Sequence, residues 1–252
     1  MTVAQSVAGG LPAVVRGFEV AYVDREGGEH RVALADAAGV RFEDGRPVRS
    51  FPSWRGQRNH PGLWWSSTSG RHVGYESWLE RDHAMLLDFD QQVTGFASQP
   101  LWLFWQESGK RRSHAPDWFA RRADGSGLVV DCRPLDRIKP RDGEAFAATE
   151  RACREIGWSY QVAGVVEPVV LANIRWLAGY RHPRHAVSRF VEPLLGMFVR
   201  PTPIRWAVER VGDPIAVLPV VFHLLWSGVL VADLSVVLGE AALVSVAEGV
   251  GR

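Results

Sequence analysis

Two acidic residues and one cation near the middle of the chain have the types and spacing of a phosphodiester-cleaving site. Asp117 lies in the string Pro-Asp-Trp-Phe, and fourteen residues later Asp131 begins the string Asp-Cys-Arg, which ends at Arg133. Carboxylates at the ends of two adjacent strands can anchor Mg²⁺, which activates a water and neutralises phosphate charge. The backbone carbonyl of Cys132 is a further candidate ligand. The same residues also fit a surface turn with an ion pair between Asp131 and Arg133 or Arg137.

A third carboxylate is expected from the helix that precedes these strands. Apolar residues recur at near-helical spacing and predict a helix over residues 76–90. Within it Glu80 is preferred to Glu76 and Asp82, because its apolar neighbours anchor the helix to the sheet and leave Glu80 at the edge of the metal site. Spacing alone leaves open that Glu80 is a solvated residue.

The order of the predicted elements indicates an α/β fold, a mixed sheet flanked by helices. A loose arm over residues 1–16 precedes a hairpin over 18–34, and residues 51–70 read as irregular structure. A second helix is expected over 143–156, with Gly157 at its C-terminal end. Alternation and turn residues predict further strands over 93–96, 101–106, 114–119, 128–132 and 160–165.

After Arg175 the chain is predicted to be mainly helical. Helices are expected over 186–199, 203–211 and 214–226, followed by a strand over 228–235. Two short helices joined at Gly212-Asp213 and followed by a hairpin suggest a winged helix-turn-helix. Residues 214–232 carry no charge, but their prolines and polar residues favour a buried helix leading into a strand over a membrane span.

Composition and charge narrow the function classes. The net charge is +1, so a nucleic-acid surface must be a local patch. Residues 175–210 hold seven Arg against two acids, which fits either phosphate contacts or a solvated face. Two cysteines make neither a disulfide framework nor a zinc site, and no secretory signal is evident, so a cytoplasmic protein is expected. The absence of a Gly-rich phosphate loop argues against an NTPase.

Longer strings and their order along the chain together resemble the TnsA-like endonuclease subunit of heteromeric transposases, as found in actinobacteria. The resemblance covers about residues 50–185. The strings are Ser-Trp-Arg-Gly-Gln-Arg (53–58), Tyr-Glu-Ser-Trp-Leu-Glu (75–80), Leu-Asp-Phe-Asp (87–90), Gln-Pro (99–100), His-Ala-Pro-Asp-Trp-Phe (114–119), Val-Val-Asp-Cys-Arg-Pro (129–134), Gly-Trp-Ser-Tyr (157–160) and Asn-Ile-Arg-Trp-Leu-Ala-Gly-Tyr-Arg (173–181).

The resemblance implies a restriction-endonuclease-like fold with a site of the PD-(D/E)XK type. The family's helix Glu falls on Glu80, its Pro-Asp aspartate on Asp117, its second polar ligand on Asp131 and its Lys on Arg133. The implied activity is Mg²⁺-dependent hydrolysis at the 5′ ends of a mobile element during DNA transposition, a form of DNA recombination, with Mn²⁺ as a substitute metal. The implied partners are transposon-end DNA, a DDE-type transposase and an AAA+ ATPase, in the bacterial cytoplasm at the nucleoid and with no membrane.

The resemblance also suggests an organisation and candidate DNA contacts. A β-rich arm is expected over 1–65, a nuclease domain over 66–180 and a winged-helix-like region over 181–252. The candidate DNA-binding residues are those of the groove and of the Arg-rich tract: Gln99, His114, Arg181, Arg184 and Arg189.

Arg133 departs from the family's Lys and leaves two functions open. Arg can stabilise transition-state charge but stays protonated, so it cannot act as a base. If the Lys acts only electrostatically, the chain is a nuclease, weakened by the change. If the Lys accepts a proton, the chain is an inactive DNA-binding or assembly subunit of the same complex. A stand-alone restriction or repair nuclease is a third interpretation.

Overall fold

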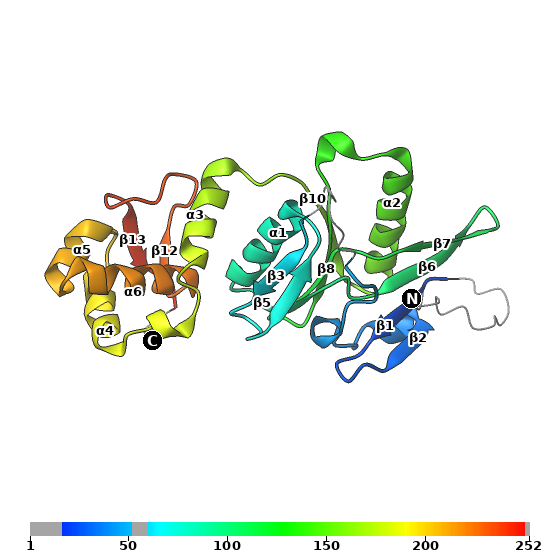
Figure 1. Cartoon of the computed structure of the whole chain (residues 1–252), viewed down its shortest axis with the longest axis horizontal. Coiled ribbons are helices and arrows are strands. Elements are labelled where there is room, and N and C mark those ends of the chain that lie inside the picture. The colour runs from blue at the N-terminus through cyan, green and yellow to red at the C-terminus, as the bar shows by residue number, and fades with distance from the viewer. Residues whose placement is uncertain (1–16, 52–59, 250–252) are drawn as a thin grey trace.

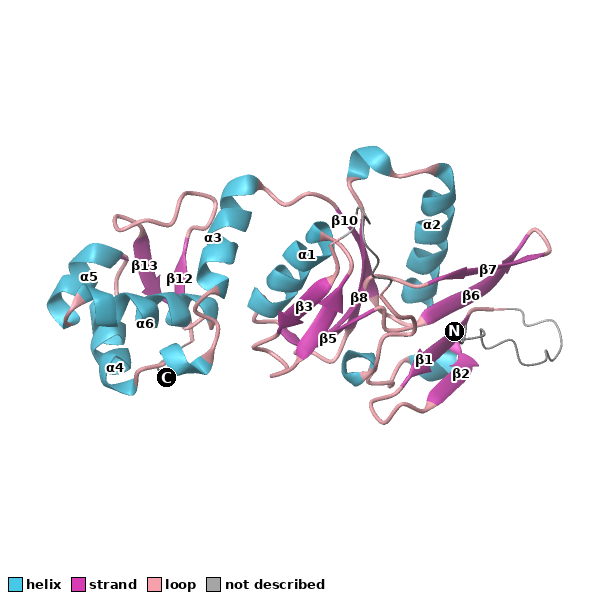
Figure 2. Ribbon diagram, viewed as in Figure 1, coloured by secondary structure: helices cyan, strands magenta, loops and turns pink. Residues whose placement is uncertain are grey.

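A computed structural model describes residues 17–51 and 60–249 of the 252. The predicted loose arm over 1–16 and the string at 53–58 lie outside the described residues. The described chain is a mixed α/β protein with several sheets and six α-helices. Figures 1 and 2 show a β-rich part that contains α1 (Trp78–Phe89) and α2 (Pro140–Glu155), beside a mainly helical C-terminal part.

The central sheet is mixed and is covered by a helix on each face. Its order is β10–β9–β8–β5, with β10 parallel to β9 and the other neighbours antiparallel: β5 (Val93–Ser98), β8 (Trp118–Arg122), β9 (Gly127–Cys132) and β10 (Ser159–Ala163). Successive side chains of a strand point to opposite faces. Val130 therefore packs in the core that contains residues of α1, whereas Val129 packs with residues of α2. Figure 1 shows the two helices on either side of β8 and β10.

A second sheet joins the N-terminal hairpin to the middle of the chain. Its order is β2–β1–β6–β7, all antiparallel: β1 (Glu19–Val23), β2 (Glu29–Ala33), β6 (Trp102–Glu107) and β7 (Lys110–His114). The predicted hairpin over 18–34 is confirmed, and it pairs with β6. The N-terminal strands thus share a sheet with residues assigned to the nuclease domain, and the proposed domain boundaries stay a prediction.

Several segments of the first part of the chain differ from the sequence prediction. The expected strand over 114–119 is broken, because β7 ends at His114 and β8 begins at Trp118 in the other sheet. Pro116 lacks the N–H that an uninterrupted ladder needs. Residues 51–70, expected to be irregular, contribute β3 (Gly62–Trp65), which pairs with β4 (His72–Tyr75). Helix α3 (Pro168–Ala178) was not predicted.

The predicted helices and hairpin of the C-terminal part are confirmed. Their chain order is α4 (Ser188–Met197), β11 (Thr202–Pro203), α5 (Ile204–Val211), α6 (Pro214–Trp226), β12 (Leu230–Ala232) and β13 (Leu243–Val246), and the strands form an antiparallel sheet β11–β13–β12. The expected strand over 228–235 is shorter than predicted. The uncharged stretch over 214–232 forms α6, which is buried on one side, and then β12, so the predicted helix leading into a strand is confirmed. No helix in the described residues is long and apolar enough to cross a membrane.

The described chain also contains four short 3-10 segments, and a side chain of α3 holds a loop of the C-terminal part. The 3-10 segments are η1 (Leu34–Ala37), η2 (Phe42–Asp44), η3 (Leu135–Arg137) and η4 (Pro183–His185). The Asn173 side chain of α3 donates to the carbonyls of Leu234 and Val236, at 2.9 and 2.7 Å, and accepts from the Leu238 N–H at 3.0 Å. This buried amide ties the loop between β12 and β13 to the helix.

Candidate active site

Asp117 and Asp131 lie side by side at the ends of adjacent strands, as the sequence predicts. Trp118 of β8 is paired with Val130 of β9, so the antiparallel register places Asp117 next to Asp131. One carboxylate oxygen of Asp117 accepts a hydrogen bond from the Cys132 N–H at 2.7 Å. The Cys132 side chain packs in the core on the α1 face, opposite to Asp131, in agreement with strand alternation.

Glu80 reaches the site from the first turn of α1. Its N–H donates to the Ser77 hydroxyl at 3.2 Å. In return its carboxylate accepts from that hydroxyl at 2.7 Å and from the Glu76 N–H at 2.8 Å. This reciprocal pattern caps the N-terminus of the helix and fixes the carboxylate. Glu80 is 7 % exposed, so it is not a solvated helix residue.

The two alternatives to Glu80 are occupied elsewhere. The Glu76 carboxylate accepts two hydrogen bonds from Arg49, at 3.1 and 2.7 Å. The Asp82 carboxylate accepts from Arg175 of α3 at 2.8 Å and also pairs with Arg81. Glu80 is therefore the carboxylate of α1 that belongs with the strand-end aspartates.

The negative charges of Glu80 and Asp131 act on Asp117. The pKa of Asp117 is raised well above its ordinary value, first by burial and then by the negative charges of Glu80 and Asp131. Burial also raises the pKa of Glu80, against the effect of its hydrogen bonds from Glu76 and Ser77. Carboxylates that repel one another in a buried place are stabilised by a proton or by a cation.

Asp131 is held by two side chains of other elements. His114, at the end of β7, places its Nε2 2.8 and 3.0 Å from the two carboxylate oxygens. Tyr160 of β10 donates its hydroxyl to Oδ2 at 2.6 Å. Burial and the charge of Asp131 raise the pKa of Tyr160, so the phenol keeps the proton that it donates. Tyr160 was not predicted as a site residue, although it ends one of the strings that carry the resemblance.

Arg133 lies at the border of the site and makes no close hydrogen bond to the three carboxylates. Its side chain is 46 % exposed, and its Nε is 3.9 Å from Asp142 at the start of α2. Its positive charge nevertheless lowers the pKa of Asp117, which burial and the neighbouring acids raise. The guanidinium is therefore near enough to act electrostatically.

The donor set is compatible with Mg²⁺. It consists of oxygen atoms, which a hard divalent cation prefers, and the repulsion at Asp117 favours a bound cation. Glu80 and Asp117 would hold such an ion, because each Glu80 oxygen accepts one hydrogen bond and keeps a second lone pair, whereas Oδ2 of Asp131 already faces both His114 and Tyr160. In the described ranges, no three His, Cys, Asp or Glu side chains are arranged to surround a metal ion as they stand.

The predicted DNA-binding residues are not gathered in one place. Gln99 is completely buried at a positive φ of 45°, so its side chain does not reach the surface. Arg181 lies over the Trp64 ring at 4.0 Å and donates to the carbonyls of Trp65 and Ala178, so it has an internal role. Arg184 and Arg189 are exposed, whereas His114 is bonded to Asp131.

No protein-family model and no curated protein matches this chain. The comparisons therefore assign no family, and the roles of the site residues stay predictions.

Replacing Asp117 with Asn is expected to stabilise the fold at high pH. Because the pKa of Asp117 is raised in the folded state, the aspartate's contribution to stability is complete below its ordinary value of 3.8 and is lost as pH rises through the raised pKa. In urea unfolding with EDTA, Asp117→Asn should equal wild type near pH 4 and exceed it by about 1–2 kcal/mol near pH 8. The control Asp124→Asn alters an exposed turn whose aspartate has a lowered pKa, so no gain is expected. An equal gain at both pH values would contradict the assignment.

Proposed function

We propose that this chain is the Mg²⁺-dependent DNA endonuclease subunit of a heteromeric transposase, which cleaves the 5′ ends of a mobile element. The observation that carries the proposal is the placement of Asp117 beside Asp131 and near Glu80, where burial and then the negative charges of Glu80 and Asp131 raise the pKa of Asp117. These residues come from a helix and two adjacent strands, the elements that the resemblance to TnsA-like subunits implies.

The finer fold assignment is part of this proposal. The central mixed sheet between α1 and α2, with acids at one strand end, supports a restriction-endonuclease-like core. The C-terminal order of helix, strand, two helices and two strands, with one antiparallel sheet, supports a winged-helix-like region.

The residues of the site divide the work of phosphodiester hydrolysis. A Mg²⁺ ion at this place would polarise the phosphate of the DNA and activate a water. Glu80 and Asp117 would hold the ion, and the Ser77 hydroxyl and the Glu76 N–H keep the Glu80 carboxylate in place. Arg133 stabilises negative charge on the phosphate, because a guanidinium stays protonated at neutral pH. The partners, a DDE-type transposase and an AAA+ ATPase, follow from the resemblance alone.

Metal-dependent nicking tests the proposal. Duplex DNA carrying an element end is incubated with the chain and its partner transposase, with Mg²⁺ or with EDTA. We expect a 5′-end nick in Mg²⁺ that EDTA removes and Mn²⁺ restores. A nick that persists in EDTA would exclude metal-assisted hydrolysis by this site.

One observation favours the alternative, an assembly subunit without cleavage activity. Arg133 stands where the family has Lys, and it is exposed and 3.9 Å from Asp142. Such a subunit binds DNA in a salt-dependent manner, and neutralising Arg184 and Arg189 weakens that binding.

Substituting Arg133 with Lys separates the two functions. In a weakened nuclease, Arg133→Lys is expected to raise the nicking rate about tenfold, because a compact ammonium approaches the phosphate more closely. The measurement is single-turnover nicking, with Arg137→Lys as the control, since Arg137 is 78 % exposed and pairs only with Asp136 among the described residues. No nicking by either the wild type or Arg133→Lys would favour the assembly subunit.

A further inference from the structure

A cavity of about 260 Å³ lies at the free edge of the central sheet. Its walls come from the turn after β1, the segment after η2, and strands β4 and β5. Three arginines line it, Arg25, Arg46 and Arg71, together with His72 and a single carboxylate, Asp44. The cavity therefore has an excess of positive charge in a chain whose net charge is only +1.

Two of the arginines are not neutralised by a carboxylate among the described residues. Arg46 donates its Nε to the Arg25 carbonyl at 3.1 Å and its Nη2 to the Glu26 carbonyl at 3.3 Å. These bonds orient the guanidinium and leave its charge unpaired. Arg25 is exposed, and its side chain has no ion pair within the described part of the chain.

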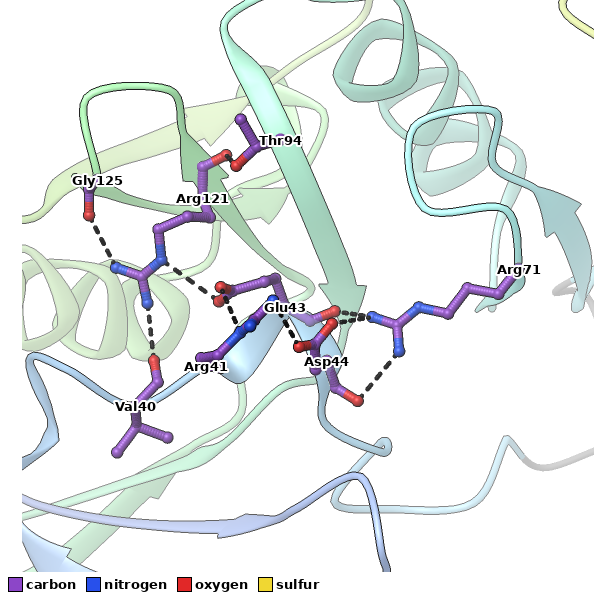
Figure 3. Close-up of polar contacts among 8 residues, drawn as sticks. All are labelled: Val40, Arg41, Glu43, Asp44, Arg71, Thr94, Arg121 and Gly125. Atoms are coloured by element: carbon purple, nitrogen blue, oxygen red, sulfur yellow. Dashed lines mark hydrogen bonds and ion pairs between the residues drawn. The ribbon is translucent and has the colours of Figure 1, made fainter.

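The third arginine, Arg71, shares the Asp44 carboxylate with Arg41. Figure 3 shows Arg71 and Arg121 approaching η2 from opposite sides. Arg71 donates to the carbonyls of Glu43 and Asp44, and its Nη2 is 3.4 Å from the Asp44 carboxylate. The other oxygen of that carboxylate is 2.9 Å from Arg41. Asp44 is thus balanced by Arg41 and Arg71, which leaves the charges of Arg25 and Arg46 for a ligand.

A buried hydroxyl also lines this cavity without a partner. Ser98 is 1 % exposed, and its Oγ has no hydrogen bond among the described residues. A buried polar group left unpaired costs about 1–3 kcal/mol, so a ligand oxygen that accepts from it would be favoured. Ser98 pairs with Trp118, the residue after Asp117, so the cavity lies one strand away from the candidate active site.

We propose that this cavity binds a phosphate group, supplied by the backbone of the DNA substrate. Planar guanidinium groups and a hydroxyl are the donors that phosphate oxygens accept from, and unpaired arginines add the charge. Because the end of β5 pairs with Trp118, the residue that follows Asp117, one DNA molecule can contact both places. The DNA source rests on the proposed function; inorganic phosphate has the same chemistry and is the other source to be tested.

The test measures DNA binding, not cleavage. Anisotropy of a labelled element-end duplex is recorded in EDTA over a range of salt for the wild type, Arg25→Ala, Ser98→Ala and the pair Arg25→Ala with Arg46→Ala. Arg25→Ala should weaken binding about three- to tenfold and lower the salt slope by about 1, and the double variant by about 2. The control Arg154→Ala removes an exposed charge of α2 that pairs with Glu150, and should leave the slope unchanged.

A second arm separates the two sources of phosphate. ³¹P line broadening of inorganic phosphate is measured with the wild type and with Arg25→Ala. Broadening that Arg25→Ala abolishes, with duplex binding unchanged, would assign the site to free phosphate and overturn the DNA assignment. Unchanged duplex binding and no broadening would overturn the site itself. Loss of binding in the variants without any nicking by the wild type would keep the phosphate site and reject the proposed nuclease.

Discussion

Replacing Asp117 with Ala is expected to lower the rate of Mg²⁺-dependent nicking about a thousandfold. Asp117 is the carboxylate on which the charges of Glu80 and Asp131 converge, and its Oδ2 is oriented by the Cys132 N–H at 2.7 Å. Removing it takes away a candidate ligand and leaves Glu80, whose hydrogen-bond donors Ser77 and Glu76 lie beside its own helix, as the other candidate ligand. The loss should appear in the single-turnover rate constant at saturating DNA.

The matched control is Asp124→Ala, at the opposite end of the same hairpin. Asp124 is exposed and accepts a hydrogen bond from the Ser126 N–H at 2.8 Å in the turn between β8 and β9. Both variants are expected to bind the duplex in EDTA as the wild type does. Equal nicking by wild type and Asp117→Ala would remove this site from the reaction and leave the assembly role.

Sequence patterns predict the elements whose buried apolar residues recur at a regular spacing along the chain. Helix α1 was found because its apolar residues recur at helical spacing between charges. Helix α3 was missed because nearly all residues of Pro168–Ala178 are apolar, so their types do not mark the face that packs against α1 and α6. The break between β7 and β8 was missed because a strand pattern continues across Pro116, although the chain there passes from one sheet to the other.

The residues of the candidate site were likewise predictable only where local sequence places them. Spacing identified Asp117 and Asp131, because they lie at the ends of strands that are consecutive in the chain. The resemblance selected Glu80, which lies in the first turn of the preceding helix. Tyr160 depends on the parallel pairing of β10 with β9, which no local pattern contains. The internal role of Arg181 likewise depends on Trp64, more than a hundred residues earlier, so the sequence offered only its charge.

The largest loss of stability is expected from a carboxylate outside the active site. Asp88 is 3 % exposed in the last turn of α1 and accepts hydrogen bonds from the β3–β4 hairpin. Its donors are the Trp64 Nε1 at 3.0 Å, the Ser66 hydroxyl at 2.8 Å, the Ser67 N–H at 3.0 Å, and the Thr68 N–H and hydroxyl at 2.9 and 2.8 Å. One side chain thus accepts hydrogen bonds from five donors of this hairpin.

Asp88→Ala is expected to lower the free energy of unfolding by about 3–5 kcal/mol, measured by urea denaturation with far-UV circular dichroism. The control Asp90→Ala, two residues later, removes an exposed carboxylate that accepts only from the Gln92 N–H among the described residues, and should cost less than about 1 kcal/mol. Similar losses in the two variants would show that the hairpin is held by its aromatic packing. The larger loss is expected first because Asp88→Ala leaves buried donors unpaired. It also removes a negative charge that acts on Arg181: burial lowers the pKa of Arg181, and the charge of Asp88 raises it.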